Sequence, residues 1–177
     1  GDHQLISVSQ KPLVEFGCNI CVGERGASYR NANIQLLIGA EAATTEYVAI
    51  AEADQLYPPG YFDFQPEPGT LVYMNEDLRI LRWWDKDMFW KKEYGDWTII
   101  VDRNNLITRL KLKLDYNLEW GVSKMGSTIP KRHWVTFNVG APVISIKTPK
   151  NLSRTTGIMR ELGSVYELPY WGKASEL

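Results

Sequence analysis

The chain has 177 residues, of which 44% are hydrophobic and 23% charged, and its formal net charge is −1. This is the composition of an ordinary globular protein, and it argues against an intrinsically disordered chain. Because the net charge is close to zero, no strong overall field attracts nucleic acid or membrane, and an electrostatic partner requires a local patch. Two cysteines are too few for a disulfide scaffold, and no apolar run is long enough to cross a membrane.

The first half of the chain predicts short strands separated by turn-forming residues. Two strands are expected at residues 4–9 and 12–22, followed by a loop at 23–28. Further strands are expected at 33–39, 46–52, 61–64 and 70–75, and the Pro-Pro-Gly sequence at 58–60 indicates a turn. Residues 77–90 fit either a short strand with a loop or a helical turn.

The stretch from Asp96 to Tyr116 is predicted to organise the fold as two strands joined at Asn104-Asn105. Its first part is β-branched and aromatic, as strands prefer. In its second part, residues 106–116, apolar and polar side chains alternate, which is typical of a half-buried strand. This alternation predicts that Leu112 and the other leucines of the strand face a core.

The same alternation places three cations together on the opposite, exposed face of the predicted strand. These are Arg109, Lys111 and Lys113, and Lys131 and Arg132 follow later in the chain. We predict that this basic face contacts RNA phosphates or a neighbouring subunit. The same residues fit an ordinary solvated face equally well.

After Tyr116, the residues predict an exit from the main body of the fold, followed by strands at 133–139 and 142–147. Many short strands separated by Gly and Pro are typical of a sandwich or a barrel. The last stretch, from residue 148, is predicted to be an arm that lies on a surface. Its residues Tyr166, Tyr170 and Trp171 are candidate assembly contacts, because Pro169 makes a central strand there unfavourable.

Catalytic and metal-binding motifs are weak in this sequence. Cys18 and Cys21 form a C-x-x-C pair, but positions three apart on a strand face opposite sides, and no second ligand pair accompanies them. His3 and His133 belong to no metal-binding grouping, so no cofactor or metal is expected. A sugar-binding cleft with an acid/base pair is an alternative; it would use Trp83, Trp84, Trp90 and Trp97 with Asp85, Asp87, Glu93 and Asp96.

The middle of the chain resembles the second half of a viral jelly-roll coat protein. YFDFQPEPGTLVYMNEDLRI (61–80) resembles the F–G region, and WWDKDMFWKKEYG (83–95) resembles the G–H loop. DWTIIVDRNN (96–105) resembles strand H, LITRLKLKLDYNLEWG (106–121) resembles strand I, and residues 31–53 resemble strands D and E. The pattern is most similar to the small coat proteins of picorna-like plant viruses of the secovirus group, especially the smallest of the three cheravirus coat proteins. Gly1 fits the site at which such polyproteins are cut.

This resemblance implies an all-β jelly-roll sandwich with a C-terminal extension. Residues 1–123 would form the jelly-roll domain, and residues 124–177 an extension that packs on its own or neighbouring subunits. The implied function is that of a non-enzymatic capsid protein in the virion of a positive-strand RNA virus, with other capsid proteins and genomic RNA as partners and no membrane contact. A carbohydrate-binding or hydrolytic β-sandwich and a viral matrix-type protein are the alternatives.

Overall fold

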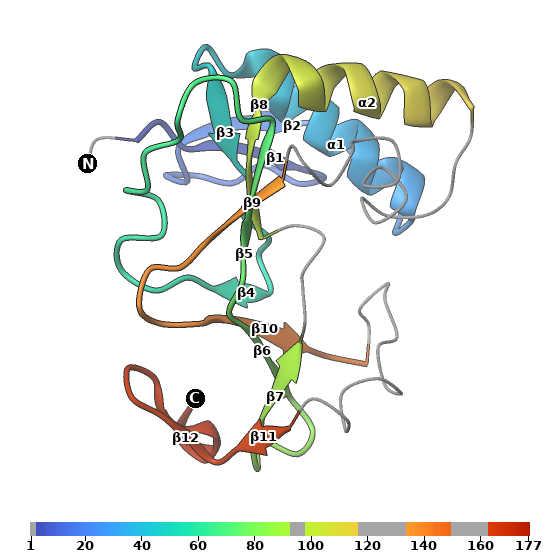
Figure 1. Cartoon of the computed structure of the whole chain (residues 1–177). Helices are drawn as coiled ribbons and strands as arrows, with labels where there is room; N and C mark the ends of the chain where they lie inside the picture. The colour runs from blue at the N-terminus through green and yellow to red at the C-terminus, as the bar shows by residue number, and fades with distance from the viewer. Residues whose placement is uncertain (1–2, 93–97, 117–133, 150–162) are drawn as a thin grey trace. The chain divides into compact units, whose positions relative to one another are not determined.

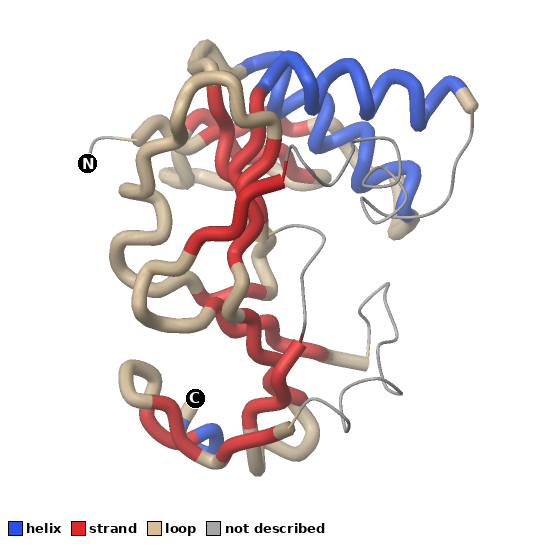
Figure 2. Tube along the Cα trace, in the orientation of Figure 1, coloured by secondary structure: helices blue, strands red, loops and turns tan. Residues whose placement is uncertain are grey.

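The structure, a computed structural model, describes residues 3–92, 98–116, 134–149 and 163–177. Most elements in these residues are strands, which form several sheets, and two α-helices accompany them (Figures 1 and 2). The fold is therefore β-rich, as the sequence predicts. The chain divides into two compact units: the first contains residues 1–49, 66–72 and 100–134, and the second contains residues 50–65, 73–99 and 135–177.

The first unit combines a small parallel sheet with a pair of packed helices. Strand β1 (Ile6–Ser9) pairs in parallel with β2 (Cys18–Cys21). Helix α1 (Tyr29–Ala42) packs against β1 and against helix α2 (Arg103–Asp115), and Figure 1 shows blue α1 beside yellow α2. The strand predicted at 4–9 is confirmed as β1. Of the strand predicted at 12–22, only the part at Cys18–Cys21 is confirmed, as β2, because residues 12–17 form turns and irregular backbone.

Helix α1 overturns the prediction of a strand at 33–39. The hydroxyl of Ser28 accepts a hydrogen bond from the backbone N–H of Asn31 at 3.1 Å, which satisfies one of the donors left open at a helix start. The segment that follows contains Ala, Gln, Leu and Glu, which are strong helix formers. These local preferences outweigh the short apolar run that suggested a strand.

Helix α2 likewise overturns the predicted strand over 106–116. The carboxylate of Asp102 caps the helix by accepting a hydrogen bond from the N–H of Asn105 at 2.6 Å. Leucine, lysine and arginine, which dominate this segment, all favour helix. The Asn104-Asn105 pair, predicted to be a turn, is therefore the first turn of α2.

Burial along α2 follows the helical period rather than the strand period. Leu106, Leu110 and Lys113 are buried, at spacings of four and three residues that place them on one side of a helix. Leu112, which the predicted strand placed in the core, is 51% exposed. The lysine at 113 takes the buried position instead.

The remaining strand predictions are largely confirmed. Strand β3 (Tyr47–Ala49) lies within 46–52, and β5 (Val72–Asn75) lies within 70–75. Together with β8 (Ile99–Asp102) and β9 (Trp134–Phe137), they form a four-stranded sheet in the order β3-β8-β5-β9. The prediction at 61–64 is wrong, because these residues form turns and irregular backbone after the Pro-Pro-Gly turn.

The second unit is built on a five-stranded sheet in the order β11-β7-β6-β10-β4. Its strands are β4 (Gln55–Leu56), β6 (Leu78–Arg82), β7 (Phe89–Lys92), β10 (Val143–Lys147) and β11 (Ser164–Val165). Strand β10 runs parallel to β6, and the other pairs are antiparallel. The ambiguous segment 77–90 is therefore strand β6, a turn and the start of β7.

The C-terminal residues complete the hydrophobic core of this sheet. Strands β12 (Glu167–Leu168) and β13 (Gly172–Lys173) form a short hairpin, which a 3-10 turn (Ala174–Glu176) follows. Leu168 and Ala174 are buried in one cluster with Leu81, Phe89 and Ile144 of the sheet. The described end of the predicted arm thus packs on its own chain. The predicted domain boundary at residue 124 lies outside the described residues.

Candidate association surface

The turn between β6 and β7 exposes two adjacent indole rings. Trp83 is 55% exposed and Trp84 is 51% exposed. The ammonium of Lys86 lies over the Trp83 ring, 4.1 Å from its centroid. Exposed Trp side chains are characteristic of binding surfaces. A Trp ring buries a large area on binding and loses little side-chain conformational entropy.

An arginine fixes the base of this turn. Arg82 forms a two-pronged ion pair with Asp85, at 2.6 Å from Nη2 to Oδ2 and 3.0 Å from Nε to Oδ1. The guanidinium carbon of Arg82 also stacks over the Trp90 ring at 4.7 Å from its centroid. The turn therefore presents its indoles from a fixed base, and Asp85 is engaged within the turn.

The register of the sheet brings the C-terminal segment to the same end of the sheet. Val165 of β11 lies opposite Phe89, the first residue of β7 after the turn. Because the two strands are antiparallel, Tyr166 continues past Phe89 toward the turn. Tyr166 is 69% exposed and Val165 is 40% exposed. We name Trp83, Trp84, Val165 and Tyr166 the aromatic edge.

The hairpin after Tyr166 adds a further exposed ring and one anchored ring. Tyr170 is 52% exposed and packs edge-on against Trp171, with ring centroids 4.9 Å apart. The indole Nε1–H of Trp171 donates a hydrogen bond to the carbonyl oxygen of Pro142 at 2.8 Å. Of the predicted assembly contacts, Tyr166 and Tyr170 are thus exposed, whereas Trp171 is half-buried and anchors the hairpin.

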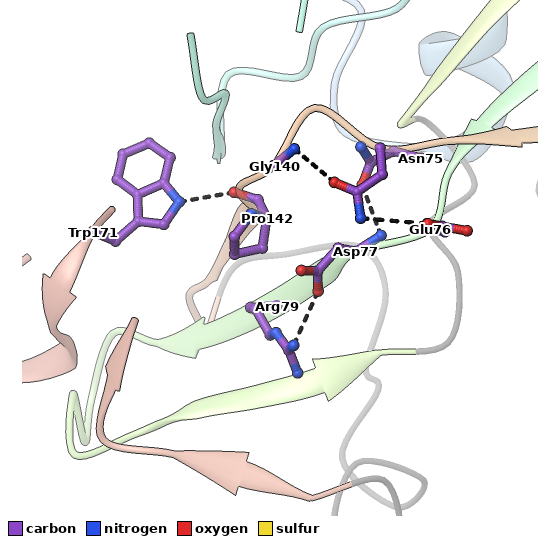
Figure 3. Close-up of polar contacts among 8 residues, drawn as sticks. Asn75, Glu76, Asp77, Arg79, Gly140, Pro142 and Trp171 are labelled. Atoms are coloured by element: carbon purple, nitrogen blue, oxygen red, sulfur yellow. Dashed lines mark hydrogen bonds and ion pairs between the residues drawn. The ribbon is translucent and has the colours of Figure 1, made fainter. Parts of the chain in front are cut away.

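The loop that receives Trp171 is held by a chain of polar contacts (Figure 3). The N–H of Gly140 donates to Asn138 Oδ1 at 2.7 Å, and the Asn138 amide donates to Glu76 Oε1 at 3.3 Å. These contacts join the β9–β10 loop to the β5–β6 turn, so the Pro142 carbonyl has a fixed position. The Asn-Val-Gly sequence at 138–140 signals a turn but not its partners.

The β5–β6 turn is itself ordered by a buried amide. Asn75 is fully buried, and its Oδ1 accepts a hydrogen bond from the Asp77 N–H at 3.0 Å. Arg79 Nη2 lies 3.0 Å from Asp77 Oδ1, as an ion pair without hydrogen-bond geometry. These contacts all lie within the second unit, and through the Pro142 carbonyl they position Trp171 of the C-terminal hairpin.

The predicted basic face does not form as one surface, because helix α2 distributes its cations around its axis. Arg109 donates to Asn105 Oδ1 at 2.7 Å, and its partial burial lowers the pKa of its guanidinium. Lys111 is exposed and pairs with Glu41 at 2.8 Å. Lys113 is buried and donates to Asn33 Oδ1 at 3.2 Å. Lys131 and Arg132 lie outside the described residues.

The structure adds little support for the other candidate sites, which are the cysteine pair, a metal site and the sugar-binding cleft. Cys18 and Cys21 are both exposed and neither forms a disulfide. Within the described ranges, no three His, Cys, Asp or Glu side chains come together as a metal site. Glu93, Asp96 and Trp97 of the predicted sugar cleft fall outside those ranges. The part of the cleft that the structure describes consists of Trp83, Trp84, Asp85 and Asp87 in the turn and Trp90 in β7, and Asp85 and Trp90 both contact Arg82.

Comparison with known proteins finds no matching family model, no matching curated protein and no matching solved structure. Neither helix in the described part of the chain has the length and apolar character needed to cross a membrane.

Proposed function

We propose that this chain is a structural coat protein that works by association, with the aromatic edge of its second unit as a subunit contact. The observation that carries the proposal is the grouping of Trp83, Trp84 and Tyr166, each at least half exposed, at one end of a sheet. Monomeric proteins rarely expose several large apolar side chains together, and tyrosine and tryptophan dominate the binding energy of protein interfaces.

The resemblance to small capsid proteins of picorna-like plant viruses supports a shell as the assembled state. In that case the chain is one of several non-enzymatic subunits of an icosahedral virion, and its partners are other capsid proteins and the RNA genome. In a closed shell each subunit makes contacts about several symmetry axes, so the aromatic edge would supply one of these contacts.

A jelly-roll arrangement of the strands is part of this proposal. The abundance of short strands supports it. Two strand pairings differ from those of a jelly roll, whose strands are antiparallel: β1 is parallel to β2, and β6 is parallel to β10. The two helices occupy segments that the resemblance assigns to strands D and I.

Any contact with RNA is expected to rest on fewer residues than the sequence predicts. Lys111 is the exposed cation on α2, and its ammonium is shared with Glu41. Arg109 is partly buried and Lys113 is fully committed to the helix pair. We therefore assign at most a minor part of the RNA contact to this helix.

Carbohydrate binding is the second candidate function, because two adjacent exposed indoles can stack on sugar rings. Trp84 is the ring to test, since Lys86 covers one face of Trp83. Titration of soluble oligosaccharides, followed by tryptophan fluorescence, should leave the spectrum unchanged if the chain is a coat protein. A saturable change that Trp84→Phe abolishes would favour the sugar-binding function.

A matched pair of tyrosine substitutions tests the proposed function. Tyr166 and Tyr116 are 69% and 73% exposed, but only Tyr166 belongs to the aromatic edge. We expect Tyr166→Ser to weaken self-association, measured by sedimentation velocity, by about tenfold or more, equivalent to about 1.4 kcal/mol. Tyr116→Ser should leave it unchanged. Equal effects of the two substitutions would contradict the proposal.

A further inference from the structure

Strand β2 has an outer edge to which no other strand of the described chain is hydrogen-bonded. The sheet of the first unit contains only β1 and β2, which pair in parallel over their whole length. Parallel sheets usually lie inside a fold with further strands beside them, and a sheet this small is marginal in isolation. The outer edge of β2 is therefore a candidate site for the addition of a strand.

The hydrogen bonds to β1 show which backbone groups of β2 point outward. The N–H of Cys18 donates to the Leu5 carbonyl at 2.8 Å, and the N–H of Val22, just after the strand, donates to β1 at 2.9 Å. Backbone groups of successive strand residues point to opposite sides, so those of Asn19 and Cys21 point away from β1. Within the described residues, no backbone hydrogen bond reaches these outward N–H and C=O groups.

The two faces of this sheet are covered by different elements. Val8 of β1 faces helix α1, because one of its methyl carbons lies 3.4 Å from the position that a Cβ at Gly39 would take. Ile20 is paired with Val8 and lies on the same face. On the other face, Asn19 Oδ1 accepts a hydrogen bond from the Leu13 N–H of the β1–β2 loop at 3.1 Å. A further strand can therefore join this sheet only along an edge.

The residues of β2 lack the features that usually prevent strand addition. Natural edge strands are protected by charged side chains, by proline or by a bulge. Strand β2 has the sequence Cys-Asn-Ile-Cys and is followed by Val22, so it carries neither a charge nor a proline. Like charges that meet across two strands are destabilising, and an uncharged strand avoids this cost when it pairs with its own copy.

From this geometry we infer that β2 pairs antiparallel with β2 of a second copy of the chain, about a two-fold axis at Ile20. In this register the outward groups of Asn19 bond those of Cys21 in the other copy, and the reverse pair forms across the axis. An axis at Asn19 or Cys21 would instead pair one of them with Gly17 or Gly23. Both glycines lie outside β2 and have positive φ, so they do not continue the strand.

The side chains agree with the same axis. Ile20 is half-buried, and across the axis it meets Ile20 of the other copy. Because Ile20 shares its face with Val8, the apolar layer between sheet and helix α1 continues into the second copy, which removes the exposed part of Ile20 from water.

This contact goes beyond the proposed function, since β2 belongs to the first unit and the aromatic edge to the second. A two-fold contact is isologous and closes after two copies, so it produces a dimer by itself. Loss of the aromatic edge is therefore expected to leave the β2 contact intact, and the two contacts can be tested separately.

Disulfide trapping on the full-length chain tests the pairing. In a chain with Cys18→Ser and Cys21→Ser, Ile20→Cys places one thiol at the axis, where the two Cα atoms of such a pair lie about 4.5 Å apart, within disulfide range. Oxidation with copper–phenanthroline should shift the chain from the monomer, at 20.3 kDa, to a covalent dimer on a non-reducing gel. Tyr116→Cys in the same background, at a 73% exposed position, is the control and should stay monomeric. Adding Tyr166→Ser should leave the trapping at Ile20 unchanged.

Hydrogen–deuterium exchange of the natural chain gives a second measurement that needs no substitution. We expect the N–H groups of Asn19 and Cys21 to exchange about tenfold more slowly, or less, at high than at low protein concentration, because pairing protects them.

Three results would overturn the inference. In the first, Ile20→Cys forms dimer no faster than Tyr116→Cys. In the second, the exchange of Asn19 and Cys21 is independent of concentration. In the third, trapping at Ile20 disappears with Tyr166→Ser, which would mean that β2 makes no contact of its own. If trapping at Ile20 is absent while Tyr166→Ser still weakens association, the proposed function stands and only the β2 contact is wrong.

Discussion

Two segments with similar sequence patterns end in different structures, and the contrast shows what periodicity leaves open. Residues 110–115 and residues 144–147 both alternate between apolar and polar positions, yet the first lie in helix α2 and the second in strand β10. The helix contains Leu, Lys and Arg after a capping aspartate, whereas the strand contains Val and Ile. Residue type and cap therefore decide the structure where the period is ambiguous.

The two segments also differ in how they are buried. Strand β10 has three consecutive buried residues, from Val143 to Ser145, because its sheet is covered on both faces in this part. Helix α2 buries one stripe, at Leu106, Leu110 and Lys113, and its other residues are partly or fully exposed. Substitutions in the sheet core are thus expected to have larger effects than substitutions on the helix.

The largest expected effect is at Phe89 of β7. Phe89 is fully buried in the cluster that joins the sheet to the C-terminal hairpin, so Phe89→Ala should lower the free energy of unfolding by about 3–5 kcal/mol. Tyr170→Ala, in the exposed part of the same hairpin, should change it by less than about 0.5 kcal/mol. Urea unfolding measures both, and a similar loss in both variants would show that the hairpin is packed differently.

A pair of leucines on α2 distinguishes the helix from the predicted strand. A strand places Leu110 and Leu112 on one face, whereas the helix buries Leu110 completely and leaves Leu112 51% exposed. We expect Leu110→Ala to destabilise the protein by about 2–5 kcal/mol and Leu112→Ala by less than about 1 kcal/mol. Equal destabilisation by the two substitutions in thermal or urea unfolding would favour the predicted strand over the helix.

Two tyrosines of the second unit, Tyr61, which is buried, and Tyr57, which is half-buried, should respond in opposite directions to replacement by phenylalanine. Tyr61 is fully buried, and its hydroxyl has no hydrogen-bond partner in the described chain, so Tyr61→Phe should stabilise the fold by about 1 kcal/mol. The Tyr57 hydroxyl accepts from the Glu52 N–H at 2.9 Å and donates to Gln55 Oε1 at 2.8 Å, so Tyr57→Phe should destabilise by about 1–3 kcal/mol. Unfolding curves with the same sign for both would contradict this assignment.

The same tyrosines predict a loss of stability at alkaline pH. Burial is the main cause that raises the pKa of both hydroxyls above the ordinary tyrosine value. A folded-state pKa above the unfolded value gives stability that is complete below pH of about 10 and falls as the pH rises toward the raised pKa. Tyr61→Phe should reduce this fall, which pH-dependent urea unfolding above pH of about 10 can measure.

A smaller effect is expected at the cap that distinguishes α2 from a strand. Asp102→Ala removes the hydrogen bond to the Asn105 N–H and should cost about 0.5–2 kcal/mol. Asp102→Asn, which keeps an oxygen acceptor, should recover most of this loss. If Asp102→Ala leaves both the stability and the helical signal in circular dichroism unchanged, the carboxylate does not determine where α2 begins.

The strands of the fold were more predictable than its helices. The β-branched and aromatic runs at 46–52, 70–75 and 142–147 identify strands because such residues pack well in sheets. Ser28 and Asp102 each cap a helix, but such side chains also occur in turns, so their role depends on the residues that follow. Pairing between distant strands, such as β6 with β10, leaves no local signal in the sequence.

The candidate surfaces were predicted only in part. Tyr166 and Tyr170 could be selected because aromatic rings beside Pro169 are poor candidates for a central strand. The exposure of Leu13, Val14 and Phe16 could not be predicted, since these residues resemble the interior of a strand and the hydrogen bond from the Leu13 N–H to Asn19 depends on the folded loop. The prediction of one basic face failed for Arg109, Lys111 and Lys113 at once. A strand places every second residue on one face, whereas a helix does not.

The most direct test of the central claim is the molecular mass of the full-length chain in solution, measured by sedimentation velocity over a wide range of concentrations. We expect the mass to increase with concentration from that of the monomer, 20.3 kDa, to that of large closed assemblies, which should appear in negative-stain images as particles of uniform size. A chain that stays at the mass of the monomer at every concentration, alone and with the nucleic acid and companion proteins of its source, would contradict it.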